Sequence, residues 1–287
     1  MKKIKFLLCS LLALSLSGCK YALLDPQGIV ASAEKQLIII STVLMLLIVV
    51  PVIIMVIYIS HKYRATNVKA KYTPNWAHST RLELLWWAIP CIIVAILAVI
   101  TWITSHTLDP YRPLDVEASK KPLTVEVVAM NWKWLFIYPE QNIAVVNFLE
   151  IPKQVPINFK ITSDAPMNSF WIPQLGGQIY AMPGMRTKLH LMADHEGLYD
   201  GWSASFSGDG FSGMHFKVKT VSPTEFNQWV TKAKSSNATL SRDAYTLLAK
   251  NSENNPITYY SSVKKGLFND VIMKYMMPPQ EMQHNKE

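Results

Sequence analysis

The chain has 287 residues, of which half are apolar and only 17% are Asp, Glu, Lys or Arg. This is more apolar than a typical soluble protein, so membrane-spanning segments are the first feature to look for. The formal charge of +8 fits a nucleic-acid partner, an anionic membrane surface or basic cytoplasmic loops. The three cysteines are Cys9, Cys19 and Cys91, so the polar part after about residue 110 has no disulfide framework and no thiolate ligand.

The first residues follow the order of a bacterial secretion signal. Three lysines within the first five residues precede an apolar stretch, Phe6 to Leu16, that is too short to span a bilayer comfortably. The Leu-Ser-Gly-Cys sequence that ends at Cys19 resembles a lipoprotein signal, in which the cysteine thiol takes the lipid. We expect a signal peptide at 1–18, acylation of Cys19 and a periplasmic segment at 19–36. An ordinary cleaved signal or an uncleaved anchor is the alternative.

Two uncharged runs follow, and each is long enough to cross a hydrocarbon core of about 30 Å. The first is 37–60 and contains Pro51; the second is 84–104 and contains Pro90. Proline is tolerated inside membrane-spanning helices, and tryptophans near the ends of the second run are typical of the membrane interface. The sequence therefore predicts two transmembrane helices.

The connection between these runs, 61–83, determines the predicted orientation. From Lys62 to Arg81 it carries five basic residues and no acidic one. Basic loops favour the cytoplasmic side, so both chain ends are predicted to be periplasmic, as a lipidated N-terminus requires. Topology thus explains much of the basic excess, and no nucleic-acid partner is needed.

After a linker at 105–121, short strand-like runs predict a β-sandwich or barrel at 122–221. Lys217 and Lys219 alternate along the last run and are predicted to face solvent. The runs are Val125–Met130, Ile143–Phe148, Val155–Ile161, Thr187–Met192 and His215–Val221.

The last part of the chain, 222–287, has a helical pattern. Ser222-Pro223 and Ser241 are suitable helix starts. We expect helices at Thr224–Lys234, Ser241–Lys250 and Val263–Met277, and a disordered tail from Pro278.

Two stretches resemble a known family. The aromatic cluster Asn131–Tyr138 is similar to the aromatic-rich signature of subunit II of haem–copper oxidases. The stretch Asp200–Met214 falls where that family holds a dinuclear copper site. The copper-bearing members have Cys, three residues, Cys, three residues, His, two residues and Met there, with a further His upstream.

This sequence keeps that spacing but not the ligands. Hydroxyls stand at both thiolate positions and at a glutamate between them, a phenyl ring and an amide replace the histidines, and only the methionine is kept. These residues are Ser203, Ser207, Ser205, Phe211, Asn168 and Met214. Dinuclear copper of this kind needs soft thiolate and imidazole ligands, so the positions are predicted to be vestigial and metal-free. The loss of ligands resembles the cytochrome bo-type quinol oxidases of the family.

The resemblance implies a membrane α-helical hairpin, an all-β cupredoxin-like Greek-key sandwich and short C-terminal helices. It implies a non-catalytic, lipid-anchored subunit of a proton-pumping oxidase that oxidises quinol and reduces dioxygen to water in a bacterial inner membrane. The chain itself would hold no cofactor, and the haems and active-site copper would belong to subunit I, its partner. The alternatives are a cytochrome c oxidase subunit with an atypical route of electron input, and a free-standing lipoprotein binding module.

Some of these residues also have simpler interpretations. Trp132, Trp134, Phe136 and Tyr138 lie at strand spacing and could pack one face of a sheet. The resemblance implies that some of them contact the catalytic subunit. Met214 is expected to fill the core.

The histidines of the polar part do not form a replacement metal site by their spacing. His190, His195 and His215 have no ligand-pair spacing, so no such site is predicted.

Overall fold

A computed structural model describes residues 22–71, 73–114 and 121–276. The chain divides into two compact units, Met1–Ala33 together with Pro110–Glu287, and Glu34–Asp109. The predicted signal peptide, Cys19 and the tail from Pro278 lie outside the described residues.

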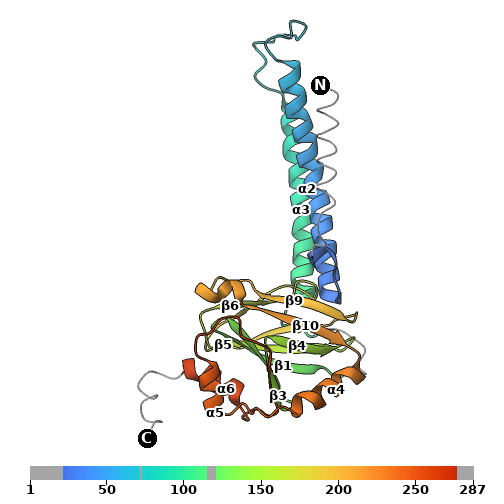
Figure 1. The fold of residues 1–287 in the computed structure, drawn as a ribbon. Coiled ribbons are helices and arrows are strands. Elements are labelled where there is room, and N and C mark those ends of the chain that lie inside the picture. The colour runs from blue at the N-terminus through green and yellow to red at the C-terminus, as the bar shows by residue number, and fades with distance from the viewer. Residues whose placement is uncertain (1–21, 72, 115–120, 277–287) are drawn as a thin grey trace, which may run out of the picture. The chain divides into compact units, whose positions relative to one another are not determined.

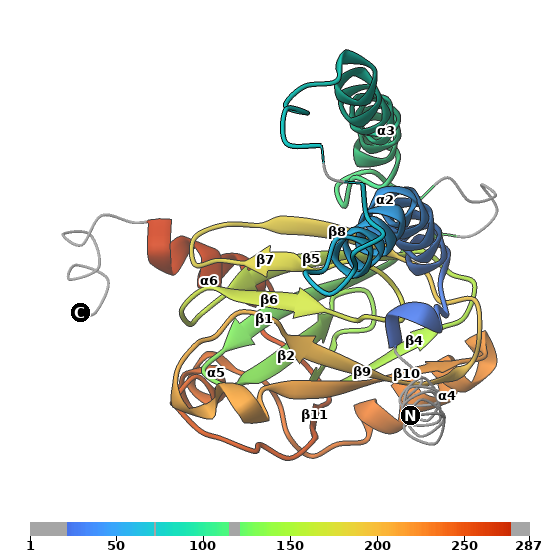
Figure 2. The same ribbon diagram turned by 90° about the horizontal axis from the view of Figure 1, so that it is seen from above.

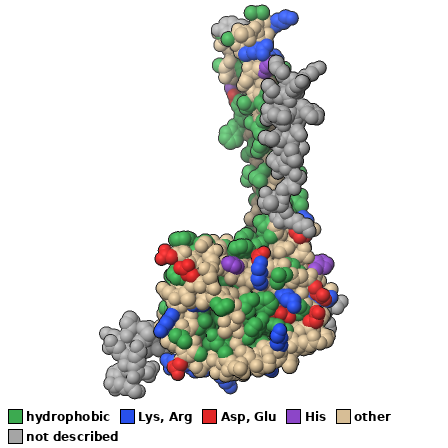
Figure 3. Space-filling view, in the orientation of Figure 1, with side chains coloured by type: hydrophobic (Ala, Val, Ile, Leu, Met, Phe, Trp, Pro, Cys, Tyr) green, Lys and Arg blue, Asp and Glu red, His purple; other side chains and the backbone are tan. Residues whose placement is uncertain are grey.

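The second unit is built from two long apolar helices, as predicted. Helix α2 spans Ile29–Lys62 and α3 spans Thr80–Thr107, with Pro51 and Pro90 inside them. Both are long and apolar enough to cross a membrane. Figure 3 shows apolar side chains along this hairpin and Lys and Arg side chains near its connecting loop. At about 1.5 Å per residue, 34 residues exceed the hydrocarbon thickness, so the ends of α2 extend beyond the apolar core of a bilayer.

Helix α2 begins eight residues before the predicted run because its first turn belongs to the other unit. The Gln27 N–H donates to the Gln174 carbonyl at 2.8 Å, and Gly28 forms a β-bridge with Ala193. A Cβ on Gly28 would lie 2.3 Å from the Met192 carbonyl oxygen, so this close approach requires glycine. Part of the predicted segment 19–36 is therefore bound to the β-domain and continues directly into α2.

The first unit contains two stacked β-sheets (Figure 2). The six-stranded sheet has the order β11-β3-β2-β1-β5-β8 and the five-stranded sheet the order β4-β10-β9-β6-β7. Most neighbouring strands are antiparallel, but β1 pairs with β5, and β4 with β10, in parallel. The strands are β1 Leu123–Met130, β2 Lys133–Tyr138, β3 Ile143–Val146, β4 Phe148–Pro152, β5 Ile157–Ser163, β6 Asn168–Trp171, β7 Ile179–Ala181, β8 Thr187–Leu191, β9 Gly197–Ser203, β10 His215–Val221 and β11 Thr258–Tyr260.

The predicted runs all contain strands, whereas several shorter strands had no clear sequence pattern. Strand β9 contains two glycines, and β6, β7 and β11 have only three or four residues. Such strands carry too little alternation to be read locally. Lys217 and Lys219 are exposed on β10, which confirms their prediction.

An aromatic cluster fills the space between the sheets. Trp134 and Phe136 from β2 meet Phe170 from β6 and Phe216 from β10, and all four are at most 1% exposed. The Phe170 and Phe216 rings stack with centroids 5.3 Å apart. Edge-to-face and offset contacts of this kind add to the gain from burial.

The C-terminal helices are α4 Pro223–Lys234, α5 Arg242–Leu248 and α6 Leu267–Met276 (Figure 1). The Ser222 and Ser241 side chains cap α4 and α5 by accepting from backbone N–H groups, as predicted from the sequence. Residues of α5 and α6 form a second apolar core with the outer face of the six-stranded sheet. This core includes Leu135, Ile137, Tyr245, Phe268 and Val271.

Candidate functional site

The predicted vestigial positions come together at one end of the five-stranded sheet. Ser203 ends β9 and Asn168 begins β6. The Ser203 hydroxyl donates to Asn168 Oδ1 at 2.8 Å, and the Asn168 amide donates to the Pro166 carbonyl at 2.8 Å. Both side chains are buried, at 7% and 0% exposure. A hydrogen bond between neutral groups thus links the two strands at this point.

The β9–β10 loop, which we define as residues 204–214, is hydrogen-bonded to β6. The Ala204 N–H donates to the Ser169 carbonyl at 3.1 Å, and the Ser169 and Ser205 hydroxyls lie 2.6 Å apart. At the far end of the loop, the Met214 carbonyl accepts from the Ser203 N–H at 3.2 Å. The loop is therefore closed by hydrogen bonds at both ends.

The surroundings of three other positions predicted to be vestigial, Met214, Phe211 and Ser207, differ. Met214 is 2% exposed and belongs to the inter-sheet core. The Phe211 ring lies 5.5 Å from the Phe206 ring, and Phe206 is 80% exposed. The Ser207 hydroxyl is buried and has no hydrogen-bond partner among the described residues.

Trp132 covers the loop from the β1–β2 turn. Its indole N–H donates to the Ser207 carbonyl at 3.1 Å. A Cβ on Gly210 would lie 2.5 Å from the ring atom Cδ2, so the indole lies directly against the loop backbone. Trp132 has φ 60°, an uncommon left-handed conformation for an aromatic residue that turns the chain between the two strands.

The four aromatic candidates therefore divide into two kinds. Trp134, Phe136 and Tyr138 have no exposed surface and pack in the sandwich core, as their strand spacing favours. Trp132 is half-buried and is the one that keeps surface for a partner. Contact with the catalytic subunit stays a prediction. Because the other three side chains are buried, Trp132 is the candidate that remains for it.

Each of the three histidines has different neighbours. His190 on β8 lies 2.9 Å through Nδ1 from the Pro110 carbonyl, and the His195 carbonyl accepts from the Tyr199 hydroxyl. His215 is exposed beside Trp202. Within residues 22–71, 73–114 and 121–276, no three His, Cys, Asp or Glu side chains gather as a metal site would require.

Two buried charged residues had no sequence signal. Lys133 is 1% exposed, and its ammonium donates to the Lys250 carbonyl at 2.8 Å and to the Ser252 hydroxyl. Burial lowers the pKa of Lys133. Asp164 follows β5 in a Ser-Asp-Ala-Pro stretch that reads as an ordinary turn, yet its carboxylate is buried. The partners of Lys133, and two of the three partners of Asp164, lie more than a hundred residues away in the chain. A local sequence pattern could therefore not reveal them.

Comparison with known proteins matches nearly the whole chain. Residues 27–102 match the transmembrane domain of cytochrome c oxidase subunit II, residues 138–221 its periplasmic domain, and residues 234–279 the COX aromatic-rich motif. The cytochrome bo(3) ubiquinol oxidase subunit 2 of Pseudomonas aeruginosa is 54% identical over 263 residues, which cover 92% of this chain and 79% of that protein. The chain belongs to the quinol oxidase subunit 2 family. The ubiquinol oxidase subunit 2 of Acetobacter aceti is 52% identical over 92% of this chain and 85% of that protein.

A solved structure also resembles the β-domain. The periplasmic domain of subunit II of cytochrome oxidase from Bradyrhizobium japonicum aligns with a TM-score of 0.39 at 22% identity, over 42% of this chain and 97% of that one. In this member of the quinol oxidase subunit 2 family, the β-sandwich is the cupredoxin-like domain. The aromatic-rich motif corresponds to the segment from the end of α4 through α6, which builds the second apolar core.

Proposed function

We propose that this chain is the membrane-anchored, non-catalytic second subunit of a proton-pumping terminal oxidase that oxidises quinol and reduces dioxygen to water. Membership of the quinol oxidase subunit 2 family supports this proposal. The subunit anchors the complex through α2, α3 and an acylated Cys19. The β-domain lies on the periplasmic side and caps subunit I, which holds the haems and the active-site copper.

The observation that carries the choice of quinol is the chemistry of the vestigial positions. The Ser203 hydroxyl donates to the Asn168 side-chain oxygen, and the Asn168 amide donates to the Pro166 carbonyl. Neutral hydroxyl and amide oxygens are hard donors, and the Phe211 ring has no lone pair, so the set does not fit the soft-ligand preference of a dinuclear copper centre. An oxidase that takes electrons from membrane quinol needs no such relay in this subunit.

The orientation rests on charge. The loop between the helices carries basic residues from Lys62 to Arg81, which favours a cytoplasmic position. The N-terminal segment and the β-domain then share the opposite side. This is consistent with the binding of Gln27 and Gly28 to the domain, which keeps both in one compact unit.

Purification of the full chain in mild detergent tests the proposal. We expect a haem-bearing partner to co-purify, oxygen uptake to be driven by quinol and not by reduced cytochrome c, and no copper to be bound by the isolated subunit. A chain that ran alone would contradict the oxidase assignment. Stoichiometric copper with a thiolate-type visible band in the isolated subunit would contradict the assignment of quinol as donor.

A further inference from the structure

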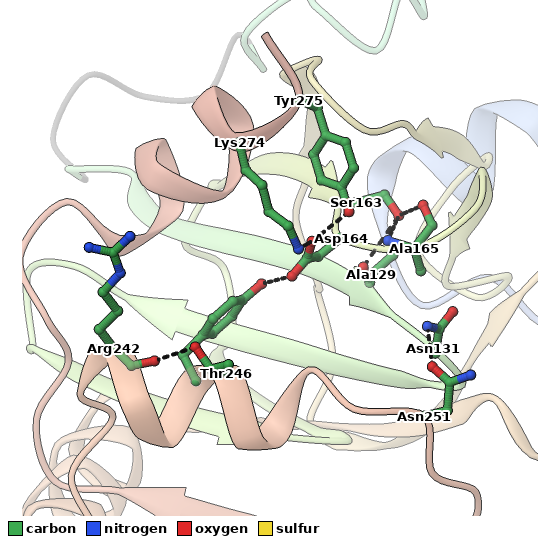
Figure 4. A network of polar contacts seen from close by, with 11 residues as sticks. Ala129, Asn131, Ser163, Asp164, Ala165, Arg242, Thr246, Asn251, Lys274 and Tyr275 are labelled. Atoms are coloured by element: carbon green, nitrogen blue, oxygen red, sulfur yellow. Dashed lines mark hydrogen bonds and ion pairs between the residues drawn. The ribbon is translucent and has the colours of Figure 1, made fainter. Parts of the chain in front are cut away.

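The carboxylate of Asp164 joins the C-terminal helices to the β-sandwich. The hydroxyl of Tyr245 on α5 donates to Asp164 Oδ2 at 2.7 Å. From α6, the Lys274 ammonium and the Tyr275 hydroxyl each donate to Oδ1 at 2.7 Å. Figure 4 shows the Lys274 and Tyr275 side chains of α6 pointing toward Asp164.

Burial makes this group different from the exposed ion pairs. The Asp164 side chain has no exposed surface, although its partner Lys274 is 52% exposed, whereas both members of the pair at the start of α6, Lys264 and Asp270, are exposed, at 38% and 52%. An exposed pair contributes little, but a buried carboxylate must be well satisfied by donors or it destabilises the fold. Three donors satisfy Asp164 only in one placement of α5 and α6, so the carboxylate selects that placement.

Asp164 also lies two residues before Pro166, whose carbonyl accepts a hydrogen bond from Asn168 at the predicted vestigial copper site. The Asp164 backbone N–H donates to the Ala129 carbonyl at 2.8 Å. The Pro166 carbonyl accepts from the Asn168 amide, whose oxygen accepts from Ser203. The position of the β5–β6 turn is thus coupled to the start of the β9–β10 loop.

A second set of contacts reaches the same loop from residues 250–255. This segment is attached to the sandwich by Lys133, by Asn131 at 2.6 Å from Asn251, and by the Asn147 amide, which donates to the Asn255 carbonyl at 3.0 Å. Figure 4 shows the Asn131 and Asn251 pair.

The other side of residues 250–255 packs on the loop. A Cβ on Gly210 would lie 2.7 Å from Glu253 Cγ, and one on Gly213 would lie 2.9 Å from Asn254 Oδ1. The loop, Trp132 and this segment are therefore in direct contact, with no room for a side chain at Gly210.

We propose that residues 242–276, which we call the C-terminal brace, hold the β9–β10 loop in its folded shape without a metal, and that Asp164 is the positioning residue through which the brace is attached. A metal would cross-link the loop to β6. In this chain the cross-link is replaced by contacts from the brace on one side and the Asn168–Ser203 hydrogen bond on the other. The proposal rests on the proposed function only in treating the loop as a former copper site.

Hydrogen exchange measured by mass spectrometry on the full chain, purified with any partner it retains, tests the brace. Asp164→Asn removes the charge that holds Lys274. Because hydrogen bonds to a charged group are stronger than those between neutral groups, exchange of amides in 204–214 and 250–255 is expected to rise by about tenfold or more. Tyr275→Phe removes a hydrogen bond to the same carboxylate from a side chain that is 43% exposed, so it is expected to raise exchange in both segments by only roughly two- to tenfold. Lys264→Gln, which breaks the exposed pair with Asp270 at the start of α6, is the matched control and should change exchange in neither segment.

Faster exchange in 250–255 with unchanged exchange in 204–214 would overturn the proposal, because the segment would then be held by Asp164 without supporting the loop. If Asp164→Asn does not accumulate, Tyr275→Phe provides the same comparison. Haem content, measured on the same samples, separates the two proposals. Absence of a haem-bearing partner from the unmodified protein counts against the proposed function, while the exchange pattern alone decides the brace.

Discussion

Removing the hydroxyl of Tyr138 should weaken the connection between the two sheets. Tyr138 lies on β2 of the six-stranded sheet, and its hydroxyl donates to the Glu150 carbonyl at 2.8 Å. The same hydroxyl accepts from the Glu150 N–H at 3.0 Å. Glu150 lies on β4, an edge strand of the five-stranded sheet, so Tyr138 satisfies backbone groups that no neighbouring strand pairs.

The magnitude follows from burial. Tyr138 is fully buried and Glu150 is 3% exposed. In Tyr138→Phe both backbone groups of Glu150 lose a partner, and leaving a buried donor or acceptor unsatisfied costs about 1–3 kcal/mol each. Since the two losses share one hydroxyl, we expect the free energy of unfolding to fall by about 2–4 kcal/mol.

Guanidinium unfolding of the full chain in detergent, followed by tryptophan fluorescence, measures this change. Tyr180→Phe is the control, because Tyr180 is 49% exposed and should change stability by no more than about 0.5 kcal/mol. The midpoint for Tyr138→Phe should fall without a change in the denaturant slope. A loss as small as that of the control would refute the reasoning, since it would mean that Glu150 does not depend on the hydroxyl.

Three further changes test other parts of the structure. Gly210→Ala places a methyl group against the Trp132 ring and should cost about 1–3 kcal/mol by overpacking, measured by the same unfolding assay; an unchanged midpoint would contradict the tight contact. Burial, and then the hydrogen bond to Asp164, raise the pKa of Tyr275, so the folded chain favours the protonated phenol. Stability should therefore fall as pH rises past about 10, and Tyr275→Phe should reduce that slope; equal slopes would contradict the assignment. Cys19→Ser should abolish the acyl mass in intact mass spectrometry yet leave the chain in the membrane fraction, because α2 and α3 still anchor it; release into the soluble fraction would contradict their role as anchors.

The local elements could be predicted from the sequence because their signals are local. Uncharged runs longer than a bilayer core marked α2 and α3, and serines at the right positions marked the starts of α4 and α5. The order of the helix pair and the aromatic cluster could also be read from the sequence, since it depends only on residue type and spacing; the lipoprotein signal and the loss of copper ligands stay predictions. The β-sandwich was legible as a class, although its shortest strands were not.

Long-range packing was decided only by the tertiary structure. The aromatic alternation of β2 suggested one buried face, but Leu135 and Ile137 on the other face are buried as well, because the C-terminal helices cover it. Trp134, Phe136 and Tyr138 on the first face are buried in the core between the sheets, and Trp132 lies against the β9–β10 loop.

The β9–β10 loop shows the same division. From Ser203, Ser207, Phe211 and Asn168 the sequence alone predicts that soft copper ligands are absent, because metal preference follows from the donor atoms. What holds the loop in their place depends on Asp164 and donors 81 to 111 residues away in the chain. A carboxylate buried by distant helices looks like any turn residue in one dimension, so only the folded chain reveals its partners.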